Sequence, residues 1–440
     1  MRLLALDIGS SSVKAAILRA DGPPRGVARV SFPTLYHDDG VAPRAEVKLA
    51  AIERAIRVAI AALGPAAKRV ELIAAATMSP SWLALDARGK PLTNDITHQD
   101  RRSVVEAAAI ERRIGKAEHL ALAGNRPFPG GISSTTIAWH LAHQRPAIDW
   151  AALVGHLGTW FAHALTGERV IDLSNAGFTG LMDIQTRTWS DRLIEAAGVD
   201  REQLPEIVES NAVVGVVTSA AARRFGLAAG TPLLAGCIDG SAAMLAAGGM
   251  NGVKVGQIVN VCGSTDVLAV CTNAPLPHDE LLTRPLGIGG KWLSVATIAA
   301  AGSAVDWAHA TFFRDLTKPA FFRHVDRLAR SDLTSRVRFD GSLAGSRTAM
   351  DVSAGRIEGL TLSADRDDVL RALLSDLVHQ AGARFDRFDD AGVRLGKDVL
   401  VTGGGSTLSK TLLRGSWPRG MRSRTLNEAT LRGLWTLANG

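Results

Sequence analysis

Small hydroxyl residues follow an aspartate near the start of the chain, in "LALDIGSSSVK" (residues 4–14). A glycine lets the backbone approach a ligand without a Cβ in the way. Successive backbone N–H groups in a tight turn form a concave site for anions, and serine hydroxyls add further donors. This turn is therefore a candidate phosphate site, and its residues are Gly9, Ser10, Ser11 and Ser12.

The same pattern returns in the second half of the chain, in "QIVNVCGSTDVLAVCT" (257–272). Aligning Gly9 with Gly263 superposes the two small polar turns and also their flanking strands. The chain therefore contains the same strand, turn, strand motif in each half. A single small polar turn would be weak evidence, because such turns are common in hairpins. Two of them could hold a polyphosphate from opposite sides. The second turn consists of Gly263, Ser264 and Thr265.

A third small-residue turn, in "VLVTGGGSTLSK" (399–410), is followed by a segment of helical character. Its backbone would offer a flat surface to a nucleobase and ribose. The P-loop pattern Gly-x-x-x-x-Gly-Lys-Ser/Thr is absent. No Gly-x-Gly-x-x-Gly follows a strand with an acidic residue about 20 positions later, which argues against a dinucleotide fold. The third turn contributes Gly403, Gly404, Gly405 and Ser406.

Strands and helices alternate around the first turn. Residues 2–8 and 13–19 read as the two strands of a hairpin. Apolar residues at helical spacing predict a helix over 49–63, which Gly64 and Pro65 end. A buried strand follows over 70–77. This alternation is typical of a layered α/β fold.

The length of 440 residues predicts two domains, because it exceeds what one ordinary core accommodates. The composition becomes glycine-rich near Gly249, which predicts a division into 1–247 and 248–440, with Gly248 and Gly249 as the flexing region. No apolar run reaches the roughly 18 residues of a membrane span, and Asp7 interrupts the first apolar run too early for a signal peptide.

The three cysteines are too few and too irregularly spaced for a disulfide framework or a zinc cluster, so a reducing cytoplasm is the predicted location. The formal net charge is +7, but the basic residues are spread along the chain. With one tyrosine and 12 phenylalanines, the chain offers few stacking surfaces. We therefore expect neither nucleic acid nor a membrane as a partner.

Taken together, the three turns resemble the nucleotide site of the sugar kinase, actin and chaperone superfamily. Within it the chain is similar to the FGGY carbohydrate kinases from end to end. The resemblance implies two ribonuclease H-like domains of the actin-like ATPase type, an interdomain cleft, and the use of ATP and Mg²⁺ to phosphorylate a sugar. A homodimer is a further expectation from this family. Besides the turns, the matching segments are 83–103, 172–208, 233–249 and 427–438.

Two aspartates receive roles from this resemblance. Asp7 would order Mg²⁺, directly or through water, because Mg²⁺ takes one or two carboxylates and keeps several waters. The alternative for Asp7 is a plain turn residue that caps the hairpin. Asp239 ends "PLLAGCIDG" and would be the general base that takes the proton of the sugar hydroxyl. Its alternative is an N-cap for the following helix.

The resemblance also implies a sugar-binding set of Trp82, Asp100 and Arg101, joined by Asp239. A lone tryptophan is more often core, and the charged run that ends at Arg102 could be a solvated turn. Lys14 could contact phosphate or be solvated, and it receives no role.

The chain departs from its family in ways that bear on the sugar. The Met-His pair of xylulokinases and the Arg-Glu pair of glycerol kinases are both missing, and Ser79 and Pro80 stand there instead. His98 replaces an aromatic residue, Gly240 replaces an amide, and Ser346 replaces a glutamate. A pentulose, xylulose before ribulose, is the expected substrate. Other ketose or polyol kinases, a degenerate kinase that senses sugar, and an actin-like nucleotide switch are the alternatives.

Overall fold

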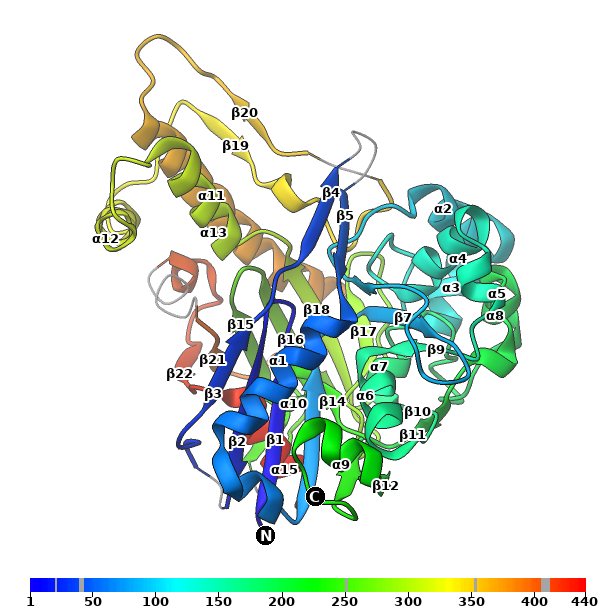
Figure 1. Ribbon diagram of the computed structural model, residues 1–440. Coiled ribbons are helices and arrows are strands. Elements are labelled where there is room, and N and C mark those ends of the chain that lie inside the picture. Colours follow the sequence, from blue (N-terminus) through cyan, green and yellow to red (C-terminus); the bar gives the residue numbers. More distant parts are fainter. Residues whose placement is uncertain (20–21, 39–42, 250–251, 352–353, 405–411) are drawn as a thin grey trace.

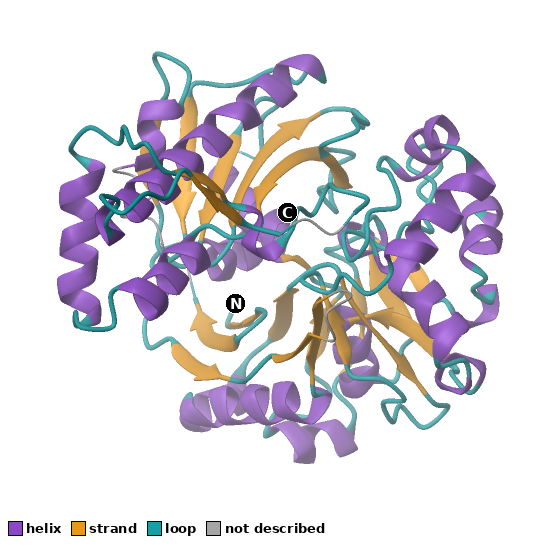
Figure 2. Cartoon of the chain, turned by 90° about the horizontal axis from the view of Figure 1, so that it is seen from above, coloured by secondary structure: helices purple, strands orange, loops and turns teal. Residues whose placement is uncertain are grey.

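The computed structural model describes residues 1–19, 22–38, 43–249, 252–351, 354–404 and 412–440. It has an α/β architecture, with two large sheets and a smaller third sheet to one side (Figure 1). Helices lie around the outside of the strands in each half (Figure 2). The predicted fold class is confirmed. None of the described helices is both long and apolar enough to cross a membrane.

The first large sheet has the order β12-β13-β6-β1-β2-β3, with β14 also pairing β6. β1 and β2 form the predicted antiparallel hairpin, in which Asp7 lies opposite Lys14, and β6 runs parallel to β1. The strands are β1 (Leu3–Ile8), β2 (Ser12–Leu18), β3 (Ala28–Ser31), β6 (Leu72–Thr77), β12 (Val213–Val216), β13 (Pro232–Leu234) and β14 (Cys237–Ile238).

The second large sheet repeats this arrangement, in the order β17-β18-β16-β15-β21-β22. β15 and β16 form an antiparallel hairpin, and β21 runs parallel to β15. The match of Gly9 with Gly263 thus corresponds to equivalent places in two similarly paired sheets. The strands are β15 (Ile258–Cys262), β16 (Asp266–Thr272), β17 (Leu282–Pro285), β18 (Trp292–Ile298), β21 (Asp398–Thr402) and β22 (Arg422–Thr425).

A five-stranded sheet lies beside the first half, in the order β4-β5-β8-β7-β9. It is built from β4 (Leu35–Asp38), β5 (Pro43–Val47), β7 (Ser81–Leu85), β8 (Asp95–Thr97) and β9 (Leu153–His156). Helices of the middle third pack beside it (Figure 1). They are α2 (Val104–Ile114), α3 (Lys116–Ala123), α4 (Ser133–His143), α5 (Pro146–Asp149) and α8 (Asp191–Ala197).

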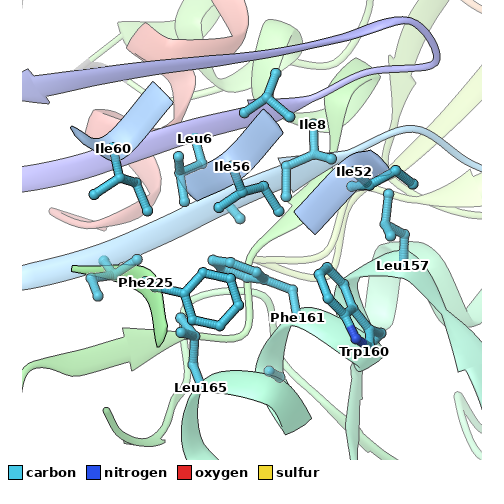
Figure 3. Packing of buried hydrophobic residues seen from close by; sticks show 14 of the residues in the cluster. Leu6, Ile8, Ile52, Ile56, Ile60, Leu157, Trp160, Phe161, Leu165 and Phe225 are labelled. Carbon is cyan, nitrogen blue, oxygen red and sulfur yellow. The ribbon is translucent and has the colours of Figure 1, made fainter. Parts of the chain in front are cut away.

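The helix predicted over 49–63 is α1 (Leu49–Ala62), and its apolar stripe packs on the first sheet. Ile52, Ile56 and Ile60 lie along α1 above Phe161 and Phe225 (Figure 3). Each of these isoleucines is at most 1% exposed, and burying one such side chain contributes about 1.5–3 kcal/mol. The stripe therefore holds α1 against the strands that carry the first turn.

Two central helices, α10 (Asp239–Gly248) and α15 (Ala429–Leu437), join the halves. One hydrophobic cluster contains Leu3 of the first sheet, Val259 of the second and Leu434 of α15. The core is thus continuous across the predicted boundary at 247 and 248, and the division into two domains stays a prediction.

The remaining elements complete the two halves. They are α6 (Leu157–Thr166), α7 (Leu173–Ala176), α9 (Ser219–Phe225), α11 (Gly302–Phe312), α12 (Lys318–Ala329), α13 (Arg366–Asp390), β10 (Val170–Asp172), β11 (Glu206–Val208), β19 (Arg338–Asp340) and β20 (Arg356–Glu358). The three cysteines are buried.

Candidate active site

A cavity of about 470 Å³ opens between the two halves and is lined by both hairpin turns. A hollow of about 670 Å³ lies elsewhere, around Lys254 and Lys397, and none of the predicted site residues lines it. We therefore take the smaller cavity as the candidate site. The predicted residues that it brings together are Asp7, Gly9, Ser10, Ser11, Ser12, Asp239, Gly263, Ser264, Thr265, Gly403 and Gly404. Gly405 and Ser406 lie outside the described residues.

Each hairpin turn is closed by one short backbone hydrogen bond. The Gly9 N–H donates to the Ser12 carbonyl at 3.0 Å, and the Gly263 N–H donates to the Thr265 carbonyl at 2.8 Å. The Ser264 carbonyl in turn accepts from the backbone N–H of Ala301 at 2.9 Å, at the start of α11. Both turns are thus held in place before any ligand arrives, as an anion site requires.

The third turn sits against the second because Gly403 has no side chain. Its φ is +95°, and a Cβ there would lie 2.2 Å from the Cys262 carbonyl oxygen. Only glycine fits such a position without displacing backbone. The first residues of the third turn therefore reach the same cavity as the second turn.

Lys14 connects two carboxylates at the phosphate end of the cavity. Its Nζ lies 2.7 Å from Glu428 Oε2 and 3.6 Å from Asp7 Oδ2. Burial raises the pKa of Asp7 to about 6, Lys14 opposes this rise, and the negative charges of Asp239 and Glu428 add to it. Asp7 is thus a carboxyl with a raised pKa inside a charged cluster.

Sequence reasoning left Lys14 without a role and did not single out Glu428. A signal for Lys14 existed, because a hairpin that turns at 9–12 places residue 14 opposite residue 7. Glu428 adopts a φ of 52°. A residue without the freedom of glycine rarely adopts this value, and such strain collects at functional sites.

Asp239 is the first residue of α10, directly after β14. The helix cap is Ile238 rather than Asp239, and within the described part of the chain the Asp239 carboxylate accepts only the N–H of Gly240, at 2.7 Å. The side chain is open to the cavity but enclosed by protein. Burial raises the pKa of Asp239, whereas the hydrogen bond from the Gly240 N–H and the positive charge of Arg347 lower it. The N-cap alternative is therefore wrong, and the carboxylate faces the cavity.

Arg347 is a cavity residue to which sequence reasoning gave no role, although it directly follows Ser346, which stands in place of the family's glutamate. It lies on the segment after β19, and its Nη2 donates to the Ser79 carbonyl at 3.2 Å. Burial lowers its pKa to about 10, Arg101 contributes to the decrease, and Asp239 opposes it. Arg347 therefore connects the C-terminal half to the acceptor end of the cavity, which we define by Ser79, His98, Phe178, Asp239 and Arg347.

Asp100 does not line the cavity. It is fully buried, and its carboxylate accepts from Arg102 Nε at 2.9 Å and from the Ala45 N–H at 2.9 Å. Arg102 also pairs with Glu46. The solvated-turn alternative is wrong for Arg102, whose side chain is 3% exposed. This ion-paired group fixes the turn that carries His98, which does line the cavity.

Trp82 and Arg101 also lie behind the cavity wall. The Trp82 Nε1 donates to Thr136 Oγ1 at 2.7 Å, and its ring packs edge-on against His140, with 5.0 Å between the ring centroids. Trp82 is thus a core residue in this arrangement. Arg101 Nη1 donates to the carbonyl of His98 at 2.8 Å, so it supports a residue of the wall.

The carboxylates of the cavity are compatible with a magnesium ion. The described residues contain no group of three histidine, cysteine, aspartate or glutamate side chains that could hold a metal. Asp7 and Asp239 nevertheless face the same cavity. Two carboxylates suit a hard cation whose other ligands are phosphate oxygens and water.

Comparison with known proteins agrees with this geometry. The N-terminal domain of the FGGY family of carbohydrate kinases matches residues 2–246, and its C-terminal domain matches residues 258–414. The chain belongs to the FGGY family of carbohydrate kinases. The family assignment made from the turns is thereby confirmed.

Individual relatives differ in what they act on. An autoinducer-2 kinase from Klebsiella pneumoniae is 30% identical over 270 residues, which are 60% of this chain and 49% of that protein. A glycerol kinase from Trichlorobacter lovleyi is 30% identical over 318 residues, 69% of this chain and 62% of that protein. The chain thus spans about half the length of the first of these FGGY relatives.

A xylulose kinase from Rhodospirillum rubrum has a similar fold, with a TM-score of 0.84 and 24% identity. The match covers 100% of this chain and 89% of that structure. At this level of identity the likeness concerns the fold.

Proposed function

We propose that this FGGY protein is an ATP-dependent kinase that transfers the γ-phosphate of ATP to a hydroxyl of a small sugar or a related acceptor. The observation that carries the proposal is the shared cavity. It places Asp239 and two phosphate-type turns, one from each half of the chain, around a space of about 470 Å³. An acceptor hydroxyl and a polyphosphate can meet there with a base beside them.

In the proposed reaction, the acceptor hydroxyl donates its proton to the Asp239 carboxylate as its oxygen attacks the γ-phosphorus. The raised pKa of Asp239 makes this carboxylate a better proton acceptor. The backbone N–H groups and hydroxyls of the two turns bind the phosphate oxygens and hold the chain of phosphates in line with the attack.

Asp7 would hold Mg²⁺ together with phosphate oxygens, and the bound ion would supply neutralising charge for the transferred group. Lys14, 3.6 Å from Asp7 Oδ2, adds a positive charge on the same side. The two halves would enclose the acceptor to keep water from ATP. A cytoplasmic location fits this use of ATP and the low number of cysteines.

For the acceptor, the proposal from the sequence is a pentulose, with xylulose before ribulose. The fold shared with a xylulose kinase supports it. The small residues Ser79 and Pro80 leave room at the acceptor end, and Ser79 lines the cavity.

The test is the release of ADP from Mg-ATP with xylulose, ribulose, other ketoses, glycerol and pentitols. The variant Asp239→Asn should lose turnover by about a hundredfold or more while it still binds nucleotide. The matched control is Asp390→Asn at the exposed end of α13, which should keep full turnover. Unchanged turnover in Asp239→Asn would contradict the assignment of Asp239 as the general base. Nucleotide binding without turnover on any acceptor would favour a sensor or a nucleotide switch.

A further inference from the structure

Asp172 is a buried carboxylate that the proposed reaction does not use. It is 3% exposed, and a charge at such a depth is costly unless other groups compensate it. Its oxygens accept hydrogen bonds from Ser174 Oγ, from the N–H and the Nδ2 of Asn175, and from Ser210 Oγ. Burial raises the pKa of Asp172, and the bonds from Ser174 and Asn175 oppose this rise. The carboxylate therefore orders the hydroxyl and amide groups around it.

Ser174 links this carboxylate to the backbone directly before Asp239. An ionised carboxylate can only accept hydrogen bonds, so the Ser174 hydroxyl donates its proton to Asp172. The lone pairs of the hydroxyl oxygen are then left for other donors, and Ser174 Oγ accepts the backbone N–H of Ile238 at 2.9 Å. Ile238 is the last residue of β14, and Asp239 follows it as the first residue of α10. Asp172 thus directs a hydrogen bond that is made one residue before the general base.

β14 is so short that the sheet alone holds its end weakly. Its two residues, Cys237 and Ile238, pair with the end of β6. The Asp239 carboxylate accepts only the N–H of Gly240, so within the described part of the chain no other element holds this side chain by a hydrogen bond. The direction of the carboxylate therefore depends on the backbone at Ile238, to which Ser174 adds a bond from outside the sheet.

The hydrogen bonds around Asp172 continue to β6 and to the acceptor end of the cavity. Asn175 Nδ2 donates to Thr77 Oγ1 at 3.2 Å, and Thr77 pairs with Ile238 in the sheet. The Asn175 carbonyl accepts the N–H of Phe178 at 2.9 Å, and Phe178 lines the cavity. One buried network thereby holds both the strand that leads to the base and a wall of the acceptor end.

We propose that Ser174 is a positioning residue for the general base. With its hydroxyl directed by Asp172, it holds the backbone of Ile238 so that the Asp239 carboxylate points at the acceptor hydroxyl. The inference rests on the proposed kinase function, in which Asp239 takes the proton. A displacement of about 1 Å at a reacting group can lower a rate by about a hundredfold. The contribution of Ser174 therefore belongs to kcat and not to the binding of either substrate.

The test compares two buried serines that donate to the same carboxylate. Ser174→Ala removes the bond to Ile238 and should lower kcat for ADP release by about tenfold to a hundredfold. KM for Mg-ATP and for the acceptor should stay within about twofold. Ser210→Ala is the matched control, because its hydroxyl donates to Asp172 at 3.4 Å but bonds no atom of β14 in the described part of the chain. It should keep the kcat of the parent chain. Equal losses of kcat in both variants, or a rise in KM alone, would overturn the proposal.

Ser174→Cys guards against a folding defect, because a thiol has nearly the shape of the hydroxyl but forms weaker hydrogen bonds. Its Tm should stay near that of the parent chain while its kcat falls by about threefold or more. A folded Ser174→Cys variant with the kcat of the parent chain would contradict the role given to Ser174.

A double-variant cycle asks whether Ser174 acts through Asp239. In the Asp239→Asn background there is no carboxylate base left to orient. Ser174→Ala should then change the residual kcat by less than about twofold, so that the two losses do not multiply. A loss of the same size in both backgrounds would show that Ser174 acts independently of the base, which would refute the inference.

Hydrogen exchange of the full chain separates this inference from the kinase function. Loss of the Ser174 bond should speed exchange of the Ile238 amide by about tenfold, and Ser210→Ala should leave that rate unchanged. Faster exchange in Ser174→Ala, in a chain whose parent releases no ADP with any acceptor, would support the positioning bond and contradict the kinase function. Unchanged exchange at Ile238 in Ser174→Ala would overturn the positioning role, whatever the turnover.

Discussion

The Lys14 Nζ lies 2.7 Å from Glu428 Oε2, so an ion pair joins the first hairpin of the chain to the residue that precedes its last helix. The two residues are 414 positions apart in the sequence. The same lysine is 3.6 Å from Asp7. One cation thereby holds two carboxylates at the place where the phosphates of ATP are proposed to lie.

Lys14→Met should weaken the use of Mg-ATP. Without the cation, Asp7 and Glu428 repel each other, and the pKa of Asp7 should rise above its value of about 6. We expect kcat/KM for Mg-ATP to fall by about tenfold or more at pH 7 and to recover in part at higher pH. Steady-state kinetics from pH 6 to 9 measure this. Lys90→Met, in an exposed turn, should match the parent chain, and an unaltered pH profile in Lys14→Met would refute the coupling.

Asp7→Asn should stabilise the folded chain while it abolishes activity. The pKa of Asp7 is raised in the folded chain from 3.8 to about 6. Its proton is bound more tightly in the folded state, so the free energy of unfolding falls as pH rises from about 4 to about 6. The asparagine amide does not ionise, so the variant does not lose stability in this way. Its free energy of unfolding should exceed that of the parent chain by at most about 3 kcal/mol at pH 8 and should equal it near pH 4. Urea unfolding at both pH values checks it, and a gain that does not depend on pH would contradict the assignment.

The three turns could be predicted because their chemistry is local. For the first two, glycine and hydroxyl residues in a row between two apolar strands specify a hairpin turn, and the third is a run of glycines directly after a buried strand. The cavity gathers the described members of all three. The place of Asp239 also has a local signal, since a buried strand, an aspartate and a small-residue helix follow one another directly, but its role as the base came from the family resemblance.

The missed residues depend on long-range packing. Arg347 donates to the carbonyl of Ser79, which lies 268 positions earlier in the sequence, and no local pattern predicts that contact. Trp82 and Asp100, in contrast, were predicted to bind the acceptor but lie behind the cavity wall. A motif places them near the acceptor, but it cannot tell a residue that lines the cavity from one that supports the wall behind it.

Gly433→Ala tests how closely the two central helices must approach. A Cβ at Gly433 of α15 would lie 1.7 Å from the carbonyl oxygen of Ala242 in α10. Because that atom is backbone, the helices would have to separate, at a cost of about 3 kcal/mol or more. Gly382→Ala within α13 meets only ordinary contacts and should be neutral or stabilising by about 0.5–1 kcal/mol. Denaturant unfolding compares them, and equal stabilities would contradict the close packing.

Asp100→Asn distinguishes support from direct binding. Asp100 is fully buried against Arg102, and loss of its charge leaves a buried guanidinium with Glu46 as its remaining carboxylate. We expect the free energy of unfolding to fall by about 3–5 kcal/mol, the range for breaking a buried ion pair. Among molecules that remain folded, KM for the acceptor and kcat should change together, because the turn that carries His98 loosens. Steady-state kinetics and denaturant unfolding of one preparation measure both effects. A large rise in KM with unchanged stability and kcat would instead place Asp100 in direct contact with the acceptor, as the family resemblance implied.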